Sequence, residues 1–177
     1  MASEAHIVWR IGKAYGFVKK YMHRGMGSVL AGLSAIIEGM NEPSVIREIL
    51  DETETIAVVG LSDKEGRASY GVSRFMQGRG YRIIPVNPLI ESSLGERAYP
   101  TIEAAAEGAG KIDLVNVFRA PEFVPEVVKE TIRLGIPYLW LQEGVVHDEA
   151  AEMAENAGIK VVMDRCILKE RMAAGWE

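Results

Sequence analysis

Short apolar runs that alternate with longer amphipathic runs are the feature that most constrains the fold of this chain. The run TIAVVG (55–60) is continuously apolar and stops at glycine, which is typical of a strand buried on both faces of a parallel sheet. Comparable runs are YRIIPVNP (81–88), IDLVNVF (112–118), IPYLWLQ (136–142) and IKVVMD (159–164). Stretches of helical periodicity separate them. This alternation predicts a doubly wound, parallel α/β sheet with helices on both faces.

Capping and breaking residues predict where the helices lie. The expected helices are SVIREILDE (44–52), YGVSRFMQGR (70–79), IEAAAEG (102–108), PEFVPEVVKETIRLG (121–135), HDEAAEMAENAG (147–158) and a short one from Cys166. We expect Ser69 and Thr101 to cap the helices that follow them, and Gly80 to end the first of these two. The stretch GERAYP (95–100) predicts a weak additional strand.

Residues 1–44 differ from the remainder in charge and periodicity. Residues 1–40 hold five basic and two acidic residues, a net +3, whereas the rest of the chain carries −8. Apolar residues recur at helical spacing from residue 8 to residue 40, which predicts a basic amphipathic helical extension of a single domain at 45–177. We favour an arm that packs on the domain or on a second subunit, as in a homo-oligomer. Contact with an anionic membrane surface is the alternative.

Composition limits the classes of function. A net charge of −5 argues against nucleic acid as a partner, and the apolar fraction of 48% is ordinary for a soluble protein. The single cysteine, Cys166, excludes an internal disulfide and fits a reducing, cytoplasmic setting. The histidines His6, His23 and His147 are scattered, so no metal site is expected. The apolar run 26–37 is too short to span a bilayer.

The loop GLSDKEGRAS (60–69) follows the first predicted strand, where doubly wound folds bind phosphate groups. Gly60 lets the backbone approach a ligand, and a helix that begins near Ser69 would offer free N–H groups. Lys64 and Arg67 add positive charge. The loop therefore predicts a diphosphate site, although its glycines lack the spacing of the dinucleotide fingerprint. A plain surface turn is the alternative.

The end of the second strand argues against NAD. NAD-binding folds place an acidic residue there to bond the ribose, whereas this chain has Pro85, Val86, Asn87 and Pro88. No acid follows until Glu91. An NAD(P)-linked oxidoreductase is therefore kept only as the alternative function. Asn next to Pro also fits a simple turn.

Two further strand ends carry candidate residues. Arg119 can reach an anion and Phe118 or Phe123 can cover a base, although Phe118 fits the core and Arg119 a solvated surface equally well. Gly144, after the fourth main strand, stands either where backbone approaches a ligand or in a structural turn.

Six motifs taken together resemble the CoA-binding domain family, in particular its small stand-alone members. They are IAVVGLSDKEGRASYGV, YRIIPVNP, LGERAYPTIEAA, DLVNVFRAPEFVPEVV, LWLQEGVV and VVMDRC. They extend from residue 45 to about 172, and the same domain resembles the N-terminal half of the succinyl-CoA synthetase alpha subunit. The resemblance implies a Rossmann-type domain that binds coenzyme A or an acyl-CoA.

The resemblance also implies which residues hold the ligand. Those expected along or near the diphosphate are Gly60, Leu61, Ser62, Asp63, Arg67 and Ser69. Those expected at the adenosine are Val86 and Asn87, while Phe118 and Arg119 line the cleft and Gln142, Glu143 and Gly144 border the pantetheine arm. The chain departs from the family pattern at Ile90, His147 and Arg171. It also has no counterpart of the synthetase's catalytic domain, so ligase activity is not expected.

Cys166 is the only thiol and the only candidate nucleophile. Arg165 and a helix N-terminus would both favour its thiolate, and His147 could approach it, although a lone cysteine in apolar company is more often inert. We therefore expect a binding protein, with a role as a metabolic or redox regulator, rather than an enzyme. A secondary hypothesis is a reversible mixed disulfide between Cys166 and CoA. A third function class is an interaction module that docks through its N-terminus.

Overall fold

The computed structural model describes residues 39–175. Residues 40–175 belong to one compact unit, which begins at Met40. The N-terminal extension at 1–44 lies almost wholly outside the described residues, so its helical form, and the oligomer and membrane contacts assigned to it, stay predictions. Among the described residues, none of the helices combines the length and the apolar character needed to cross a membrane.

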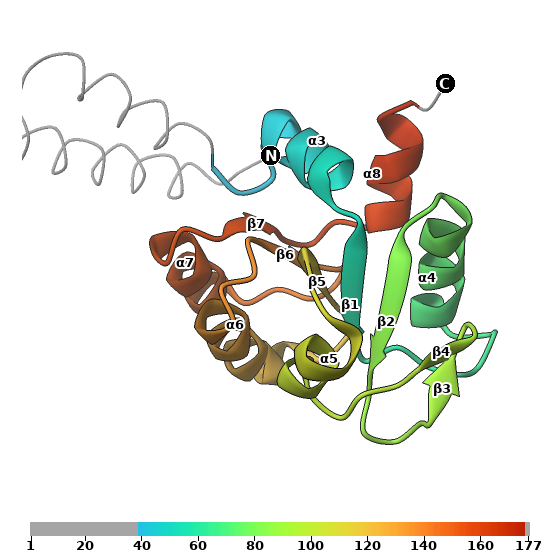
Figure 1. Cartoon of the computed structure of the whole chain (residues 1–177). Coiled ribbons are helices and arrows are strands. Elements are labelled where there is room, and N and C mark those ends of the chain that lie inside the picture. Colours follow the sequence, from blue (N-terminus) through green and yellow to red (C-terminus); the bar gives the residue numbers. More distant parts are fainter. Residues whose placement is uncertain (1–38, 176–177) are drawn as a thin grey trace, which may run out of the picture. The chain divides into compact units, whose positions relative to one another are not determined.

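A five-stranded parallel sheet forms the centre of the unit (Figure 1). Its strands are β1 (Thr55–Val59), β2 (Arg82–Val86), β5 (Leu114–Val117), β6 (Tyr138–Leu141) and β7 (Lys160–Val162), in the order β2-β1-β5-β6-β7. All five runs predicted as buried strands are present, and every pairing is parallel. The prediction of a doubly wound α/β sheet is confirmed.

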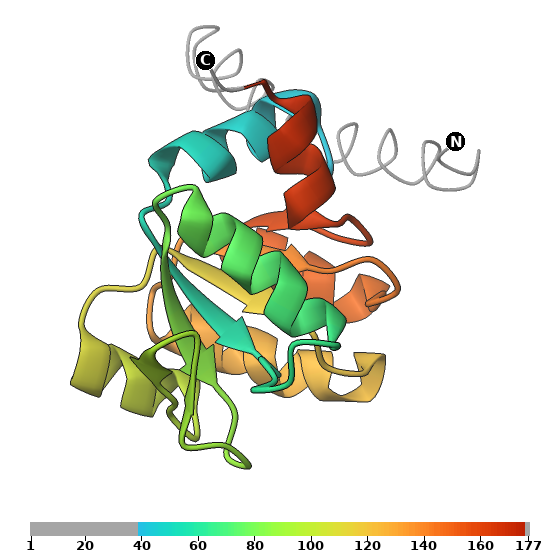
Figure 2. The same ribbon diagram turned by 90° about the vertical axis from the view of Figure 1, so that its right-hand side faces the viewer.

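Helices cover both faces of this sheet (Figure 2). One face carries α3 (Pro43–Glu52), α4 (Ala68–Gly78) and α8 (Ile167–Ala173), and the other carries α5 (Ile102–Ala109), α6 (Val124–Arg133) and α7 (Asp148–Asn156). Neighbouring residues of one strand enter opposite cores: Leu114 packs with the first group and Val115 with the second. Burial on both faces explains why these strands are continuously apolar.

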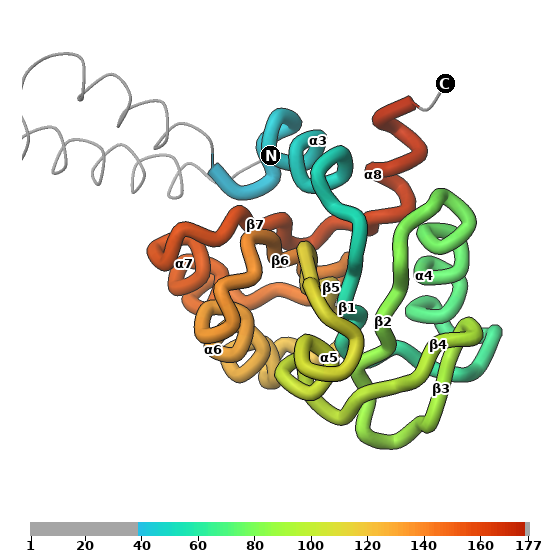
Figure 3. Tube along the Cα trace, viewed as in Figure 1, coloured from blue at the N-terminus to red at the C-terminus, as the bar shows by residue number. Residues whose placement is uncertain are grey.

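The chain crosses from β2 to α5 through a small hairpin, which can be followed in Figure 3. This hairpin pairs β3 (Ser92–Ser93) with β4 (Glu96–Arg97) in antiparallel fashion, at the place where the sequence predicted a weak strand. A single parallel bridge then joins Tyr99 to Val86. The hairpin therefore lies against the end of β2.

One predicted cap is confirmed and another is wrong. Thr101 Oγ1 accepts a hydrogen bond from the N–H of Ala104 at 3.1 Å and caps α5. Ser69 does not cap α4, because the helix begins at Ala68, two residues before the predicted start, and Arg67 occupies the cap position without a side-chain bond. The Ser69 hydroxyl instead accepts from the N–H of Ser62 at 3.1 Å. The Ser69 side chain therefore stabilises the preceding loop rather than the start of the helix.

Arg171 fastens α8 to the amino-terminal side of the sheet. Its side chain is 2% exposed, and its Nη1 lies 3.2 Å from Oδ1 of Asp51 in α3. The guanidinium also lies 5.6 Å from the centre of the Tyr81 ring, whose hydroxyl donates to the carbonyl of Leu50 at 2.7 Å. A buried arginine held in this way fixes the position of α8 and of the residues that precede it.

Asp113 joins the amino ends of β1 and β5. Its Oδ2 accepts hydrogen bonds from the N–H groups of Glu54 at 3.1 Å and Thr55 at 2.9 Å, and its Oδ1 lies 2.7 Å from Nζ of Lys111. Burial acts to raise the pKa of Asp113, but the bonds to Lys111 and to the two N–H groups outweigh it and hold the pKa below its ordinary value. The ionised carboxylate therefore stabilises the folded chain.

We expect Asp113→Asn to lower the free energy of unfolding at pH 7 by about 1 kcal/mol, because an amide accepts weaker hydrogen bonds and loses the ion pair. A depressed folded-state pKa contributes stability that is complete at neutral pH and is lost as the pH falls below about 4. Urea unfolding at pH 7 and pH 3 measures the free energy of unfolding of both proteins. The difference between Asp113→Asn and the wild type should be smaller at pH 3 than at pH 7.

Glu54→Gln is the matched control, because the neighbouring Glu54 side chain is exposed. It should change the free energy of unfolding little at either pH. A gap for Asp113→Asn that is equally wide at pH 3 and pH 7 would assign the loss to packing rather than to the charge.

Candidate functional site

The carboxyl edge of the sheet contains a topological switch point. β1 lies between β2 and β5, and the loops that leave β1 and β5 lead to α4 and α6 on opposite faces. In open α/β sheets, ligands bind where two such neighbouring loops diverge. The edge at the ends of β1, β2 and β5 therefore has the position of a ligand site.

Gly60 brings three strand ends into contact. Its N–H donates to the carbonyl of Val86 at 2.9 Å, which joins the end of β1 to the end of β2. Its φ is +85°, and a Cβ at this position would lie 3.1 Å from both the carbonyl oxygen of Phe118 and Cδ of Arg119. Only glycine fits this conformation and this spacing without strain. Gly60, Val86, Phe118 and Arg119 are thus brought together at this edge.

The loop after Gly60 is held by its own serines. The Ser69 hydroxyl accepts from the N–H of Ser62, and the Ser62 hydroxyl accepts from the N–H of Lys64 at 3.1 Å. Because each hydroxyl accepts in these bonds, each keeps its proton as a donor. Within the described residues, the exposed side chains of Asp63 and Arg67 make no hydrogen bond or ion pair to other predicted site residues. The first turn of α4 presents N–H groups without a side-chain cap.

Asn87 ties the end of β2 to the same loop. Its Nδ2 donates to the carbonyl of Leu61 at 2.8 Å, and its Oδ1 accepts from the N–H of Leu89 at 3.0 Å. The second bond forms a turn, which is the role that the sequence predicted for Asn87 as the alternative to a ligand contact. Leu61 is fully buried beneath this contact. The side chain of Asn87 thus shapes the loops at the edge.

A buried pair of amides lies at the ends of β5 and β6. Gln142 Nε2 donates to Oδ1 of Asn116 at 2.8 Å, and both side chains are almost fully buried. Gln142 was among the predicted site residues, whereas Asn116 was not. The signal for it was present, since Asn116 is a polar residue inside the apolar run IDLVNVF. Burial of an unpaired amide is costly, so each of these two fixes the other.

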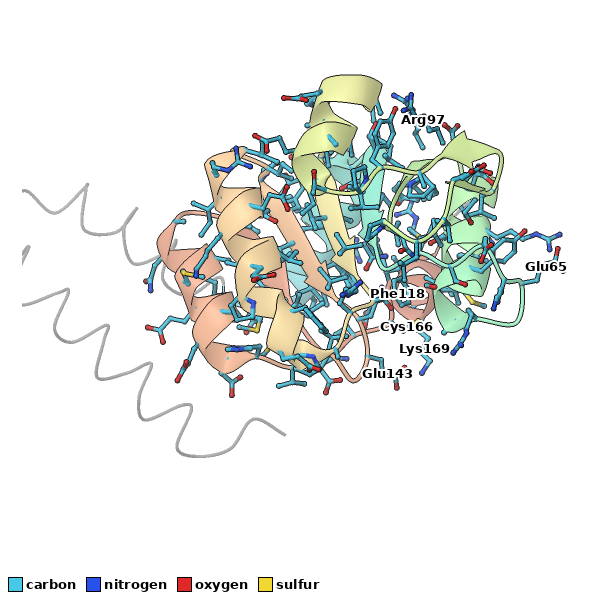
Figure 4. The ribbon with its side chains drawn as sticks, turned by 90° about the horizontal axis from the view of Figure 1, so that it is seen from below. Glu65, Arg97, Phe118, Glu143, Cys166 and Lys169 are labelled. Atoms are coloured by element: carbon cyan, nitrogen blue, oxygen red, sulfur yellow. The ribbon has the colours of Figure 1, made fainter. Side chains whose placement is uncertain are left out.

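The loop after β6 and the start of α8 face each other. Gly144 has a φ of +83°, and its N–H donates to Oδ1 of Asp164 at 2.8 Å, which makes it a structural turn residue. Glu143 forms an ion pair with Lys169 of α8 at 2.6 Å. The bond and the charge of Glu143, with a smaller contribution from Cys166, raise the pKa of Lys169. In Figure 4, Phe118, Glu143, Cys166 and Lys169 gather in one part of this edge.

Cys166 precedes the first turn of α8, as the sequence predicted, but the side chains of Arg165 and His147 are engaged elsewhere. The guanidinium of Arg165 pairs with Glu170 at 3.3 Å. Nδ1 of His147 accepts from the N–H of Ala150 at 3.3 Å and so caps α7. The thiol of Cys166 itself is half-buried. In the part of the chain that the structure describes, no group of three or more His, Cys, Asp or Glu side chains is arranged to hold a metal ion.

Known proteins are similar to this chain in sequence and in fold. The model of the CoA binding domain matches residues 54–172. The uncharacterized protein YneT of Bacillus subtilis strain 168 is 46% identical over 130 residues, which cover 72% of this chain and 94% of YneT. The solved structure of a hypothetical protein from Pyrococcus horikoshii OT3 superimposes with a TM-score of 0.70 at 33% identity, over 75% of this chain and 91% of the other.

A larger enzyme shares only this domain. The ADP-forming acetate–CoA ligase I of Archaeoglobus fulgidus is 24% identical over 124 residues, which are 64% of this chain but 18% of the ligase. The family model spans well over half of the present chain, and YneT aligns over nearly its whole length. The resemblance found in the six motifs is therefore confirmed, and the chain belongs to the CoA-binding domain family.

Proposed function

We propose that this protein binds coenzyme A or an acyl-CoA at the carboxyl edge of its sheet and acts as a binding protein, in a metabolic or redox regulatory role. The observation that carries the proposal is the contact of Gly60 with Phe118 and Arg119 at the switch point. This contact brings a phosphate-type loop to the adjoining strand end, in a chain of the CoA-binding domain family.

The diphosphate of CoA is assigned to the loop between β1 and α4. The N–H groups of the first turn of α4 and the helix dipole favour an anion there. The hydroxyls of Ser62 and Ser69 each keep a proton to donate, and Arg67 at the helix start adds a positive charge. Gly60, Leu61 and Asp63 contribute backbone along the same path.

The two ends of the ligand are assigned to opposite sides of this loop. The adenosine is placed at Val86 and Asn87, at the end of β2. The pantetheine arm passes Phe118 and Arg119 toward Gln142, Glu143 and Gly144, so that its thiol ends beside Cys166. The gathering of Phe118, Glu143 and Cys166 in one part of the edge supports this direction (Figure 4).

The alternative, an NAD(P)-linked oxidoreductase, is less well supported. NAD-binding folds have a carboxylate after the second strand that accepts a hydrogen bond from the ribose. This chain has Asn87 there, and its amide oxygen already accepts from the N–H of Leu89. One relative with a named activity is an acetate–CoA ligase, whose name contains CoA.

Binding of CoA to the purified protein is the direct test. We expect CoA to bind and NAD not to bind at comparable concentrations, by isothermal titration calorimetry of the reduced protein. Gly60→Ala should weaken CoA binding at least about tenfold, because a Cβ would push Phe118 and Arg119 aside and strain a left-handed turn.

Gly66→Ala is the matched control in the same loop, since a Cβ there meets nothing within 4 Å. It should leave CoA binding unchanged. Thermal unfolding of both variants separates loss of the site from loss of the fold. NAD binding without CoA binding would overturn the proposal in favour of the oxidoreductase.

The proposal extends to a mixed disulfide between Cys166 and CoA. The thiolate of Cys166 would attack one sulfur of CoA disulfide, forming the Cys166–CoA bond, while the second CoA leaves as a thiolate and takes up a proton. The partial exposure of Cys166 and its place beside residues assigned to the pantetheine arm (Figure 4) support this step.

With CoA disulfide, we expect the wild-type protein to gain one CoA that survives denaturation and is released by a reductant. Cys166→Ser should bind reduced CoA with similar affinity but gain no covalent CoA. Intact-mass spectrometry under denaturing conditions measures the adduct. If the wild type gains none, the disulfide step is wrong, whereas CoA binding is judged by the calorimetry alone.

A further inference from the structure

CoA carries a third phosphate in addition to its diphosphate. This phosphate is on the ribose 3′-oxygen, far from the thiol, and it distinguishes CoA from dephospho-CoA. If the adenosine lies at the end of β2, the cation that meets this phosphate must come from nearby. No lysine or arginine occurs between Arg82 and Arg97. Arg82 is at the amino end of β2, where its Nη1 donates to the carbonyl of Ala109 at 2.8 Å.

Arg97 lies beside the end of β2. It is the last residue of β4, and two residues later Tyr99 donates its N–H to the carbonyl of Pro85 at 2.9 Å. The carbonyl of Tyr99 in turn accepts from the N–H of Asn87 at 2.8 Å. These two bonds hold the segment that contains Arg97 against the residues assigned to the adenosine.

The side chain of Arg97 is supported by an aromatic ring. Its guanidinium lies 5.5 Å from the centre of the Tyr99 ring, a cation–π arrangement. The ring is itself fixed against α5, where Gly108 makes room for it and a Cβ would collide with it. An arginine that is held by stacking loses less conformational freedom when it binds a phosphate.

The hairpin that carries Arg97 is also tied to the diphosphate loop. Ser93 Oγ donates to the carbonyl of Ser62 at 2.9 Å, and Gln77 Nε2 of α4 donates to the carbonyl of Leu94 at 3.0 Å. The loop assigned to the diphosphate and the hairpin therefore hold each other in a fixed arrangement. A ligand that contacts both would meet a preformed surface.

Lys64 and Arg67 belong to the loop assigned to the diphosphate, and several of the other cations at this edge have partners. Lys169 pairs with Glu143 and Arg165 with Glu170, while the guanidinium of Arg119 lies 4.4 Å from the ring centre of Phe123. Arg97 is exposed, and within residues 39–175 no carboxylate lies within ion-pair distance of it. Figure 4 shows Arg97 well apart from the group of Phe118, Cys166 and Lys169. An extended CoA, with adenosine and thiol at opposite ends, matches this separation.

We propose that Arg97 binds the ribose 3′-phosphate and gives the site its preference for CoA over dephospho-CoA. The inference rests on the proposed function and deepens it, since it names the part of the ligand that the hairpin recognises. The guanidinium presents paired N–H donors to phosphate oxygens, which a stacked arginine does without rearrangement.

The test compares the affinities for CoA and dephospho-CoA by calorimetry, with the full chain. The wild type should prefer CoA by at least about tenfold, the ratio expected of one charge-assisted contact. Arg97→Gln should abolish most of this preference through weaker CoA binding, with the affinity for dephospho-CoA unchanged within about twofold. Arg97→Lys, which keeps the charge, should retain part of the preference.

Arg79→Gln is the matched control. Arg79 is also exposed, and its guanidinium lies 5.0 Å from the centre of the Phe75 ring. It follows the last turn of α4, at the opposite end of this helix from the loop assigned to the diphosphate. This variant should keep the full preference for CoA.

The outcomes separate the inference from the function on which it rests. Equal binding of CoA and dephospho-CoA by the wild type, or a preference that Arg97→Gln leaves intact, would overturn the role of Arg97 while CoA binding stands. A loss of both affinities in Arg97→Gln would also overturn it, since the residue would then act on the adenosine site as a whole. Binding of neither ligand to the wild type would overturn the proposed function itself.

Discussion

The close approach of Gly60 to the backbone of Phe118 organises the carboxyl edge of this sheet. A parallel sheet by itself leaves the loops after β1 and β5 free to take separate paths to opposite faces. Here the absent side chain of Gly60 lets the two strand ends meet, and the bond from its N–H to Val86 adds the end of β2. Asn87 and Ser93 then fasten the later loops to the same stretch of backbone. The candidate site is consequently built from backbone that is fixed in place before any ligand arrives.

Local patterns allowed most of the fold to be predicted from the sequence. The strands were found because burial on both faces demands continuous apolar runs, and the Thr101 cap because it depends on residues three apart. Ser69 has the same chemistry as Thr101, but the prediction that it caps a helix was wrong. Its hydroxyl instead accepts a hydrogen bond from the N–H of Ser62 in the preceding loop. No local sequence pattern indicates this contact.

The parts of the candidate site that the sequence did not reveal depend on strand register. Asn116 and Gln142 are 26 residues apart, and they meet because β5 and β6 pair in parallel with Asn116 opposite Trp140. The position of the hairpin against β2 likewise depends on the bridge between Tyr99 and Val86. A sequence shows which residues are polar in an apolar run, whereas the partner follows only from the pairing of strands.

The two edges of the sheet use charge in different ways. At the amino edge, carboxylates are matched closely: Asp113 with Lys111 and backbone N–H groups, Asp51 with the buried Arg171, and Glu48 with Lys160. These contacts hold the strands and α3 and α8 in register. At the carboxyl edge, Lys64, Arg67 and Arg97 stand without ion-pair partners among the described residues, although the chain as a whole carries −5. These cations lie in the loop assigned to the diphosphate and in the hairpin beside the end of β2, where the proposed function places the phosphates of the ligand, and exposed cations of this kind contribute little to the stability of the fold. Substitutions at the amino edge should therefore change stability, and those at the carboxyl edge should change affinity, because the two sets of contacts share no charged residue.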